Sequence, residues 1–373
     1  MKENITHLTT VHSRYDTRIF SKECFSLDFE GYQVNLIVAD GKGNETINGI
    51  RIIDIGRPKN RILRSTYYFI KILIKSFKID SSVYHIHDPE LVPLSIFLKL
   101  RKKKLIFDIH ENITKQILAK EYLPKFTRKF LSKTYQFIER ITLKNFDHLI
   151  LAEDSYFDLY KQFDNTIIHN FPVVKNQLIN STNSPISQIV YVGHWFEIER
   201  GILELLQVIN QLKTRNKIRL VLIGEFYKGS AAERLARKYI KENDLENYII
   251  FKGRMKYHDI FPILASSTAG IVCLHPKDNF VTSYPTKLFE YMLSSIPVIC
   301  SSFPLWERII SENDCGICVD PLNVTEIVNS IVYILDNPSQ AAIMGENGRK
   351  AVISKYNWQN ESKKLIKLYR DII

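Results

Sequence analysis

Residues 283–292, SYPTKLFEYM, lie between two apolar runs and decide the predicted fold of this chain. The run before them, residues 270–274 (GIVCL), is typical of a buried strand, and a polar loop at 275–284 follows it. Pro285 predicts the first position of a helix, because its fixed φ suits that position. A second apolar strand is expected at 297–300. Strand, loop, helix and strand in this order predict one unit of a parallel sheet.

The predicted helix has an apolar face and a charged face. Leu288 and Met292 lie four residues apart and face inward, whereas Lys287 and Glu290 lie three apart on the other face. The free N–H groups of the first helical turn favour an anion, and Lys287 adds a full positive charge. The Glu290 carboxylate can accept hydrogen bonds from a sugar diol. This turn is therefore a candidate site for a phosphate and a ribose; the alternative is a surface Lys–Glu pair.

The same stretch resembles the nucleotide-sugar motif of retaining glycosyltransferases of family 4, which have the GT-B fold. In that motif seven residues separate two Glu, and the second Glu binds the ribose of the donor. Glu290 matches the second Glu, and Thr282 stands where the family has the first, which contacts hydroxyls of the donor sugar. The resemblance implies donor-binding roles for Thr282, Ser283, Tyr284, Lys287 and Glu290. The wording PTKLFEYM also resembles a bacterial subgroup that builds surface polysaccharides.

Composition restricts the class of protein and of partner. The chain has 373 residues, of which 45% are apolar and 24% charged, so two globular domains are expected. Its net charge of +11 requires an anionic partner, such as a nucleotide diphosphate or anionic lipid. Patterns typical of nucleic-acid binding are missing from the sequence, so no nucleic-acid partner is expected.

The five cysteines and the N-terminal residues bear on the expected location. An odd number of cysteines, without the apolar core of a signal peptide, favours a reducing cytoplasm. No segment approaches the roughly 20 apolar residues of a membrane span. The expected location is the cytoplasm, with peripheral attachment to the inner face of the cell membrane.

The first strand–helix–strand pattern covers residues 5–39, without the G-x-G-x-x-G fingerprint of dinucleotide-binding domains. The loop at 12–18 follows the first strand and so lies at the carboxyl edge of the sheet, where open α/β sheets bind ligands. Arg14, Asp16 and Arg18 are candidates for a role in a cleft there. The alternative is a solvated loop.

Two further strands of this half end in histidines and carboxylates. Residues 82–90 (SVYHIHDPE) and 105–112 (LIFDIHEN) bring these groups to one edge of the sheet, which indicates an active cleft. The candidates there are His87, Asp88, His110 and Glu111. In family 4 a His at the end of such a strand faces the donor sugar. The resemblance therefore implies that His110 is catalytic.

Residues 115–145 form the basic amphipathic region of the chain. Eight Lys and Arg residues oppose two Glu, and aromatic and aliphatic residues interleave with them. Such a segment can lie on an anionic membrane surface. The alternative is a core-packed helix pair with a solvated basic face.

A new α/β pattern begins at residues 189–193, and the loop 194–201 then opens a helix expected at 202–212. Family members carry an Arg and, six residues later, a Lys on the donor diphosphate at this place. His194 and Arg200 occupy these two positions here. Arg200 can bind phosphate oxygens with two hydrogen bonds, whereas His194 is a weaker cation at neutral pH.

Together these patterns imply an α/β protein with the GT-B fold, in which two Rossmann-like domains with parallel sheets face each other across a cleft. Residues 1–171 form the acceptor-side domain, and the final helix, 358–373, packs back on it. Residues 172–185, rich in Asn, Ser and Pro, are the expected linker. Residues 186–357 form the nucleotide-sugar domain.

The implied function is transfer of a sugar, with retention, from a nucleotide diphosphate sugar to a glycan or polyprenyl-linked acceptor. This is an EC 2.4 hexosyltransferase reaction, expected in capsule, O-antigen lipopolysaccharide or exopolysaccharide synthesis. His110 and Arg200 are the catalytic candidates. No cofactor and no metal are expected, because the sequence has no D-x-D pair to hold a divalent ion for the diphosphate. An anionic membrane surface is a further expected partner.

Three alternatives stay open. One is a GT-B sugar-nucleotide epimerase, which would act without an acceptor. The second is a non-catalytic protein of the same fold that binds a nucleotide sugar or serves as a scaffold, which Thr282 and His194 keep in consideration. The third is a basic nucleic-acid binder, whose affinity would depend steeply on salt.

Overall fold

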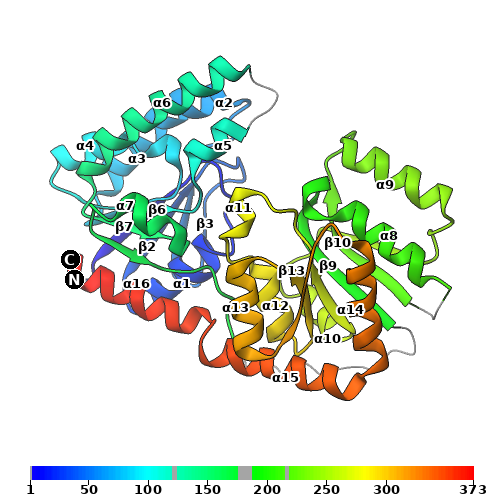
Figure 1. Cartoon of the computed structure of the whole chain (residues 1–373). Helices are drawn as coiled ribbons and strands as arrows, with labels where there is room; N and C mark the ends of the chain where they lie inside the picture. Colours follow the sequence, from blue (N-terminus) through cyan, green and yellow to red (C-terminus); the bar gives the residue numbers. More distant parts are fainter. Residues whose placement is uncertain (1, 120–123, 175–186, 215–217) are drawn as a thin grey trace. The chain divides into compact units, whose positions relative to one another are not determined.

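The computed structural model describes residues 2–119, 124–174, 187–214 and 218–373 (Figure 1). The chain divides into two compact units. The first comprises Met1–Asn170 with Gln359–Ile373, and the second comprises Phe171–Trp358. From residue 175 on, the expected linker lies outside the described residues.

The first unit contains a sheet of eight described strands in the order β3-β4-β2-β1-β5-β6-β7-β8. Their bounds are β1 Asn4–Leu8, β2 Gln33–Val38, β3 Glu45–Ile47, β4 Ile50–Asp54, β5 Val83–Ile86, β6 Lys104–Ile109, β7 His148–Leu151 and β8 Asn165–Ile167. All neighbours pair in parallel except β3 and β4, which form an antiparallel hairpin. Asn48 and Gly49 both have positive φ in its two-residue turn, as Asn-Gly hairpins favour. The sequence-based prediction omitted this hairpin.

Helices cover both faces of this sheet (Figure 1). They are a π-helical segment Ile19–Cys24 that continues into α1 Phe25–Phe29, then α2 Arg61–Leu63, α3 Phe69–Ile79, α4 Leu94–Leu100, α5 Ile113–Ala119, α6 Lys125–Thr142, α7 Phe157–Tyr160 and α16 Trp358–Ile372. Tyr84 of β5 faces α3, where its hydroxyl donates to Ser76 O at 2.6 Å. The next residue, His85, faces the opposite side and its Nδ1 lies 2.9 Å from the Tyr369 hydroxyl of α16.

The second unit contains a sheet of six described strands, all parallel, in the order β11-β10-β9-β12-β13-β14. Their bounds are β9 Ser187–Phe196, β10 Ile218–Phe226, β11 Ile249–Gly253, β12 Ala269–Val272, β13 Val298–Ser301 and β14 Gly316–Val319. The prediction of two α/β domains with parallel sheets is therefore confirmed, with the β3–β4 hairpin as an antiparallel addition at one edge.

Two hydrophobic cores lie on the two faces of this second sheet (Figure 1). One core is covered by α8 Ile202–Leu212, α9 Ala231–Glu242 and α14 Val324–Asp336. The other is covered by α10 Ile260–Ala265, α12 Thr286–Leu293, α13 Pro304–Asn313 and α15 Pro338–Ser354. The short α11, Asp278–Val281, precedes α12.

Several local expectations are wrong in detail. Pro285 is the residue before α12 rather than its first helical residue, because its backbone is extended and its carbonyl accepts the first helical bond, from Leu288 N at 3.0 Å. The expected loop at 275–284 contains α11. β9 continues to Phe196, so His194 lies in a strand rather than in a loop. Among the described residues, no helix combines the length and apolar character needed to cross a bilayer.

Candidate active site

The stretch 283–292, with which the sequence analysis began, contains the buried helix α12. Every residue of α12 from 287 to 293 is buried, including Lys287 and Glu290, whose exposed fractions are 8% and 6%. The surface Lys–Glu pair that the sequence left open as an alternative is therefore excluded. Glu290 lies beside Tyr257, and its charge adds to the effect of burial in raising the pKa of that phenol.

The ammonium group of Lys287 is an unpaired buried cation. Its Nζ has no hydrogen-bond partner among the described residues and lies 4.1 Å from the centroid of the Tyr191 ring. Burial, followed by the positive charge of Arg200, lowers the pKa of Lys287 to about 7, although Glu290 acts in the opposite direction. A buried cation without a carboxylate partner is costly, so this position favours an anionic ligand.

Arg200 and its neighbours bring further positive charge to the same region. Gly201 adopts a left-handed φ of 77°, and a Cβ there would lie 2.1 Å from the Cys273 carbonyl oxygen, so the turn before α8 requires glycine. The turn presents Arg200, whose Nε donates to Glu197 Oε2 at 2.7 Å. The guanidinium of Arg200 lies 5.3 Å from the Phe280 ring of α11. Arg200 is thus held in place while one third of its side chain stays exposed.

His194 contributes little charge at neutral pH. Burial and the positive charges of Arg254 and Arg200 lower the pKa of its imidazole. Arg254 stacks on the Trp195 ring at 4.3 Å and pairs with Glu225 at 2.9 Å. Arg254 was missed as a candidate, although it stands directly after the Gly253 turn. It is the stronger cation beside β9.

The three residues before Pro285 differ in their surroundings. Thr282 is exposed at the end of α11. The carbonyl of Ser283 accepts a hydrogen bond from Trp306 Nε1 at 2.8 Å, and the ring of Tyr284 stacks against Phe289 with centroids 6.2 Å apart. Ser283 and Tyr284 therefore hold the start of α12 in place, and Thr282 is the one of the three with an exposed side chain.

In the first unit, Asp88 holds the loop that follows β1. Its Oδ2 accepts hydrogen bonds from the backbone N–H groups of Thr10 and Val11, and its Oδ1 accepts from the Thr9 hydroxyl at 2.9 Å. Asp88 is fully buried. It therefore fixes the carboxyl edge of the sheet between β1 and β5, and it is not available as an acceptor for a ligand.

Asp108 joins the two predicted histidines. Its carboxylate binds Arg18 with two hydrogen bonds of 2.9 Å, and its Oδ2 lies 3.5 Å from His87 Nδ1 and 3.3 Å from His110 Nε2. Burial, more than the charges of Arg18 and its other neighbours, lowers the pKa of His110 to about 3. His110 is therefore a neutral imidazole whose Nε2 faces a carboxylate, which leaves Nδ1 as the acceptor nitrogen.

The three candidate residues of the loop 12–18 differ in their contacts. Arg14 is buried and paired with Asp40 and Glu45 at 2.6 and 2.5 Å, so it is neither solvated nor available to a ligand. Arg18 is likewise buried on Asp108. Asp16 accepts backbone bonds from Arg18 and Ile19 at the start of the helical segment. The candidate cleft residues thus organise the loop instead of lining it.

His12 is a site residue that sequence reasoning missed. Its ring lies 5.6 Å from that of His110, and its Nδ1 is 3.5 Å from Asp16 Oδ2. Burial lowers the pKa of His12, but Asp16, Asp88 and Asp108 outweigh it, so the pKa is raised. Glu111, in contrast, is exposed and bonds to Gln116. The position of His12 after β1 was the available signal.

A second feature of the first unit is a fully buried cluster of His7, Glu23, His85 and His87. One imidazole nitrogen or carboxylate oxygen from each residue lies within 4.8 Å of the others, as metal ligands would. His87, Asp108 and His110 form a second set with the same spacing. Burial, then the charge of Asp108, holds the pKa of Glu23 well above its usual range, whereas the positive charge of Arg18, whose Nε lies 3.1 Å from Glu23 Oε1, acts in the opposite direction. The hydrogen bonds of the cluster are incomplete, because His7 Nε2, both Glu23 carboxylate oxygens, His85 Nε2 and His87 Nδ1 are buried without a hydrogen-bond partner among the described residues. The expected absence of a metal stays a prediction.

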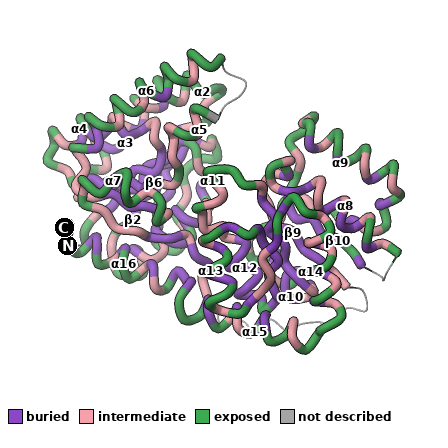
Figure 2. The backbone as a smooth tube through the Cα atoms, in the orientation of Figure 1, coloured by how far each residue is buried: buried purple, intermediate pink, exposed green. Residues whose placement is uncertain are grey.

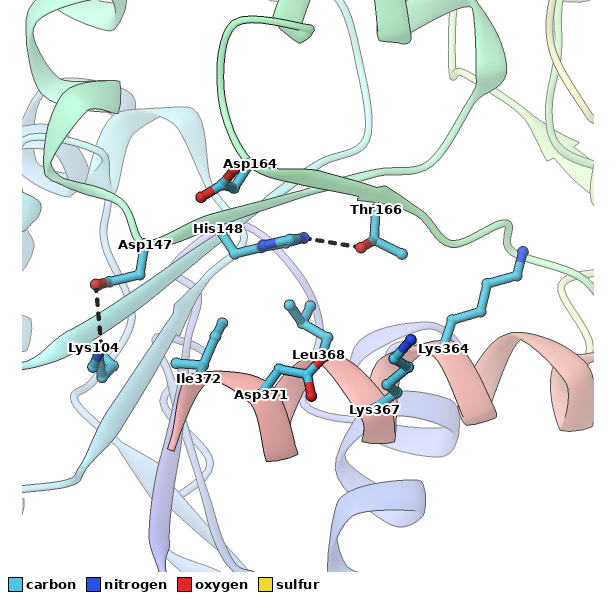
Figure 3. Close-up of a pocket in the computed structure, with 10 residues that line it drawn as sticks. All are labelled: Lys104, Asp147, His148, Asp164, Thr166, Lys364, Lys367, Leu368, Asp371 and Ile372. Carbon is cyan, nitrogen blue, oxygen red and sulfur yellow. Dashed lines mark hydrogen bonds and ion pairs between the residues drawn. The ribbon is translucent and has the colours of Figure 1, made fainter.

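A separate hollow of about 610 Å³ lies at the opposite, amino edge of the first sheet (Figure 3). Lys104 and His148 begin β6 and β7 there, and α16 forms the other wall. Its remaining lining residues are Asp147, Asp164, Thr166, Lys364, Lys367, Leu368, Asp371 and Ile372. Lysines and aspartates alternate around it and partly pair, so it offers no net charge for a diphosphate.

The cationic site of the second unit agrees with a family match. Residues 177–351 match the family described as Glycosyl transferases group 1. The chain is a glycosyltransferase. The prediction of a glycosyltransferase of this family is confirmed, whereas its subgroup stays a prediction.

Two relatives are similar to this glycosyltransferase at low identity. An uncharacterized glycosyltransferase from Methanocaldococcus jannaschii is 22% identical over 306 residues, which cover 74% of this chain and 71% of that protein. A poly(ribitol-phosphate) alpha-N-acetylglucosaminyltransferase from Staphylococcus aureus is 23% identical over 234 residues. That match covers 59% of this chain and only 43% of the relative.

Solved structures show the same fold. A sucrose-phosphate synthase from Thermosynechococcus elongatus superimposes with a TM-score of 0.78 at 17% identity, over 99% of both chains. The Anabaena protein HepE in complex with UDP-glucose superimposes with a TM-score of 0.72 at 12% identity, again over 99% of both chains. The glycosyltransferase therefore has two parallel-sheet α/β domains of the GT-B kind.

Proposed function

We propose that this glycosyltransferase transfers a sugar, with retention, from a nucleotide diphosphate sugar to a glycan or polyprenyl-linked acceptor. The observation that carries the proposal is Lys287 at the start of α12, a buried ammonium group that has no hydrogen-bond partner in the described part of the chain. A diphosphate would supply the missing negative charge. Glu290, one turn further along α12, would accept hydrogen bonds from the ribose.

The arrangement suits the chemistry of such a transfer. Departure of the nucleotide diphosphate builds negative charge, which preorganised cations and N–H groups stabilise. Lys287, Arg200 and the first turn of α12 provide these groups in one unit, and we propose that they act without a metal. The complex of HepE with UDP-glucose, a protein of the same fold, supports a nucleotide sugar as the donor.

We assign the catalytic role in the first unit to His110. Its neutral imidazole is oriented by Asp108 and held at the end of β6, with part of its side chain exposed. An acceptor nitrogen can take a hydrogen bond from a sugar hydroxyl without bringing positive charge to the reacting carbon. His110 would then orient the transferred sugar, while the diphosphate leaves on the cationic side.

The place of the reaction in metabolism is proposed from the resemblance of three motifs. Residues 82–90, 105–112 and 283–292 resemble those of a bacterial subgroup that builds surface polysaccharides. The Staphylococcus aureus relative, named for a poly(ribitol-phosphate) acceptor, is compatible with a glycopolymer acceptor. We therefore propose synthesis of capsule, O-antigen or exopolysaccharide, on the cytoplasmic side of the cell membrane.

The proposal is tested by a thermal-shift and hydrolysis screen against UDP-, GDP-, ADP- and dTDP-sugars, with and without EDTA. We expect one nucleotide class to stabilise the protein and to be hydrolysed slowly, at a rate that EDTA does not change. A complete lack of stabilisation by all four classes would contradict the proposal. Loss of activity with EDTA would contradict its metal-independent form.

A non-catalytic nucleotide-sugar-binding protein is the second candidate, and the weak positive charge of His194 favours it. The family pattern has an Arg at that position, so the stabilisation of a leaving group is reduced here unless Arg254 replaces it. Tight donor binding without turnover toward any acceptor would support this candidate. Acceptor-free conversion of the donor into its epimer would support the epimerase alternative.

A further inference from the structure

Helix α6 turns its polar side toward the protein. Ser132 and Thr142 are buried, and Glu139 is half-buried. Glu139 Oε1 accepts hydrogen bonds from the hydroxyls of Tyr135 and Tyr160, each at 3.1 Å. The helix is thus held to its unit by hydroxyl and carboxyl groups. A core-packed helix would instead bury its large apolar residues.

The outward side of α6 is apolar. Phe126, Phe130, Phe137 and Ile141 are exposed by 83%, 61%, 67% and 48%. At 3.6 residues per turn these four side chains lie within an arc of about 60° along one stripe of the helix. Figure 2 shows α6 exposed at the outside of its unit. Large aromatic rings gathered on a surface mark an interaction site rather than ordinary surface composition.

Positive charges border this stripe. Lys129, Lys133 and Arg140 fall beside it on the same helical projection, and all three are exposed. The sole acidic residue in the sequence of α6 is Glu139, which is turned inward onto two tyrosines. The outward surface therefore carries aromatic and aliphatic groups with cations and no carboxylate from this helix.

We propose that the outward face of α6 docks on an anionic lipid bilayer. The phenylalanine rings would enter the boundary between headgroups and acyl chains, while the Lys and Arg side chains reach the lipid phosphates. The inference extends the proposed function, and rests on it in one respect: a polyprenyl-linked acceptor lies in such a bilayer. The exposed apolar stripe favours docking of α6 on a bilayer over the alternative of a core-packed helix with a solvated basic face.

Charge favours a bilayer over a second copy of the chain as the occupant. A symmetric dimer would bring the same face of α6 from both copies together, so that Lys129, Lys133 and Arg140 would oppose their own equivalents. Like charges across an interface cost free energy, and the chain as a whole carries +11. An anionic surface complements both the cations and the apolar stripe.

Sedimentation with lipid vesicles tests the proposal on the full chain, without donor or acceptor. We expect the protein to bind vesicles that contain about one third phosphatidylglycerol and not vesicles of pure phosphatidylcholine, with binding weakened by salt. Combined replacement Phe126→Ser, Phe130→Ser and Phe137→Ser should lower the partition coefficient at least tenfold. The pair Lys129→Glu and Lys133→Glu should lower it similarly on phosphatidylglycerol vesicles.

Helix α9 supplies matched controls, because it is also basic and exposed. Lys238→Glu with Lys241→Glu removes the same charge as the α6 pair, and Leu235→Ser removes an apolar side chain that is 45% exposed. These variants should bind vesicles like the wild type. Equal loss in the α9 variants would overturn the role of α6 and leave only general electrostatic attraction.

Two other outcomes would also overturn the proposal. One is a wild type that binds neither kind of vesicle. The other is a dimer in gel filtration that the phenylalanine variants dissociate, which would assign the face to a second copy. Each variant is checked by its melting temperature and by its thermal shift with the nucleotide sugar. Because that shift needs no vesicle, failure of lipid binding and failure of the proposed transfer are told apart.

Discussion

Lys287 Nζ lies 4.1 Å above the centre of the Tyr191 ring, and neither this ammonium group nor the Tyr191 hydroxyl has a hydrogen-bond partner among the described residues. The ring stabilises the cation only in part, since a cation–π contact contributes roughly 0.5–2 kcal/mol. In the free protein the positive charge at the start of α12 is therefore destabilised, and the pKa of Lys287 falls to about 7. Binding of an anion is the event that would relieve it.

Donor binding should therefore take up a proton. The pKa of Lys287 is lowered to about 7 in the free protein, and a bound diphosphate would raise it again. Uptake should approach one proton at about pH 8 and vanish near pH 6, where Lys287 is already charged. Calorimetry in buffers of different ionisation enthalpy measures this number. Lys287→Met should abolish the uptake and, because it removes a buried charge, raise the melting temperature; uptake that persists in this variant would contradict the assignment.

Glu290→Ala should weaken nucleotide-sugar binding. The expected loss is roughly tenfold to a hundredfold, because a hydrogen bond to a charged group contributes about 1.5–3 kcal/mol. Isothermal titration with the donor measures it. Glu307→Ala, which changes an exposed carboxylate on α13, is the matched control and should bind as the wild type does. Unchanged affinity in Glu290→Ala would remove this residue from the site.

Arg200→Ala should slow turnover at saturating donor. We expect a decrease of roughly a hundredfold, the size found for single groups that stabilise a leaving anion. Arg200→Lys should be intermediate, because an ammonium group keeps the charge but not the two parallel hydrogen bonds. The measurement is the steady-state rate of donor hydrolysis. A wild-type rate in Arg200→Ala would exclude the residue from leaving-group stabilisation.

His110→Ala should keep donor binding and lose transfer. The pKa of His110 is lowered to about 3, so this residue should cause no change in rate between about pH 5 and pH 8. The pH profile of the wild type and a donor titration of the variant check the two statements. His148→Ala is a suitable control, because His148 begins β7 at the amino edge of the sheet. Full transfer activity in His110→Ala would contradict the catalytic role.

Asp88→Ala should destabilise the first unit. The replacement leaves the N–H group of the buried Thr10 without its acceptor, at a cost of about 1–3 kcal/mol, and removes one of the two acceptors of the Val11 N–H group. The melting temperature of the full chain should fall, whereas the exposed Asp158→Ala should leave it unchanged. Equal melting temperatures would show that Asp88 does not hold the loop.

The local sequence predicted the secondary structure that carries the candidate donor site. The spacing of Lys287 and Glu290 placed both on one turn of a helix, and the helix Ile202–Leu212 was expected with these bounds. The i and i+3 spacing is the same for an exposed pair and a buried one, however. Only the packing of α12 against the sheet shows that both side chains are buried and that Lys287 Nζ has no hydrogen-bond partner among the residues that the structure describes.

In the first unit, by contrast, the contacts of the charged residues could not be predicted from local sequence. Arg14 and Arg18 looked like loop cations facing a cleft, but they bind carboxylates that lie 26 and 90 positions further along the chain. The role of His12 was equally hidden, because it depends on His110 and Asp88 from other strands. Contacts of this length are set by sheet order, which no local pattern contains.

By itself, the sequence determined the α/β class, the approximate course of most helices and strands, and the residue types available for a diphosphate and a sugar. These follow from periodicity, Pro and Gly positions, and the chemistry of side chains within one turn or one strand end. Only the tertiary structure decided which charges are neutralised by a distant partner, and which face of α6 turns outward. Both depend on burial and on long-range pairs, because the free energy of a charge or an aromatic ring is set by its surroundings.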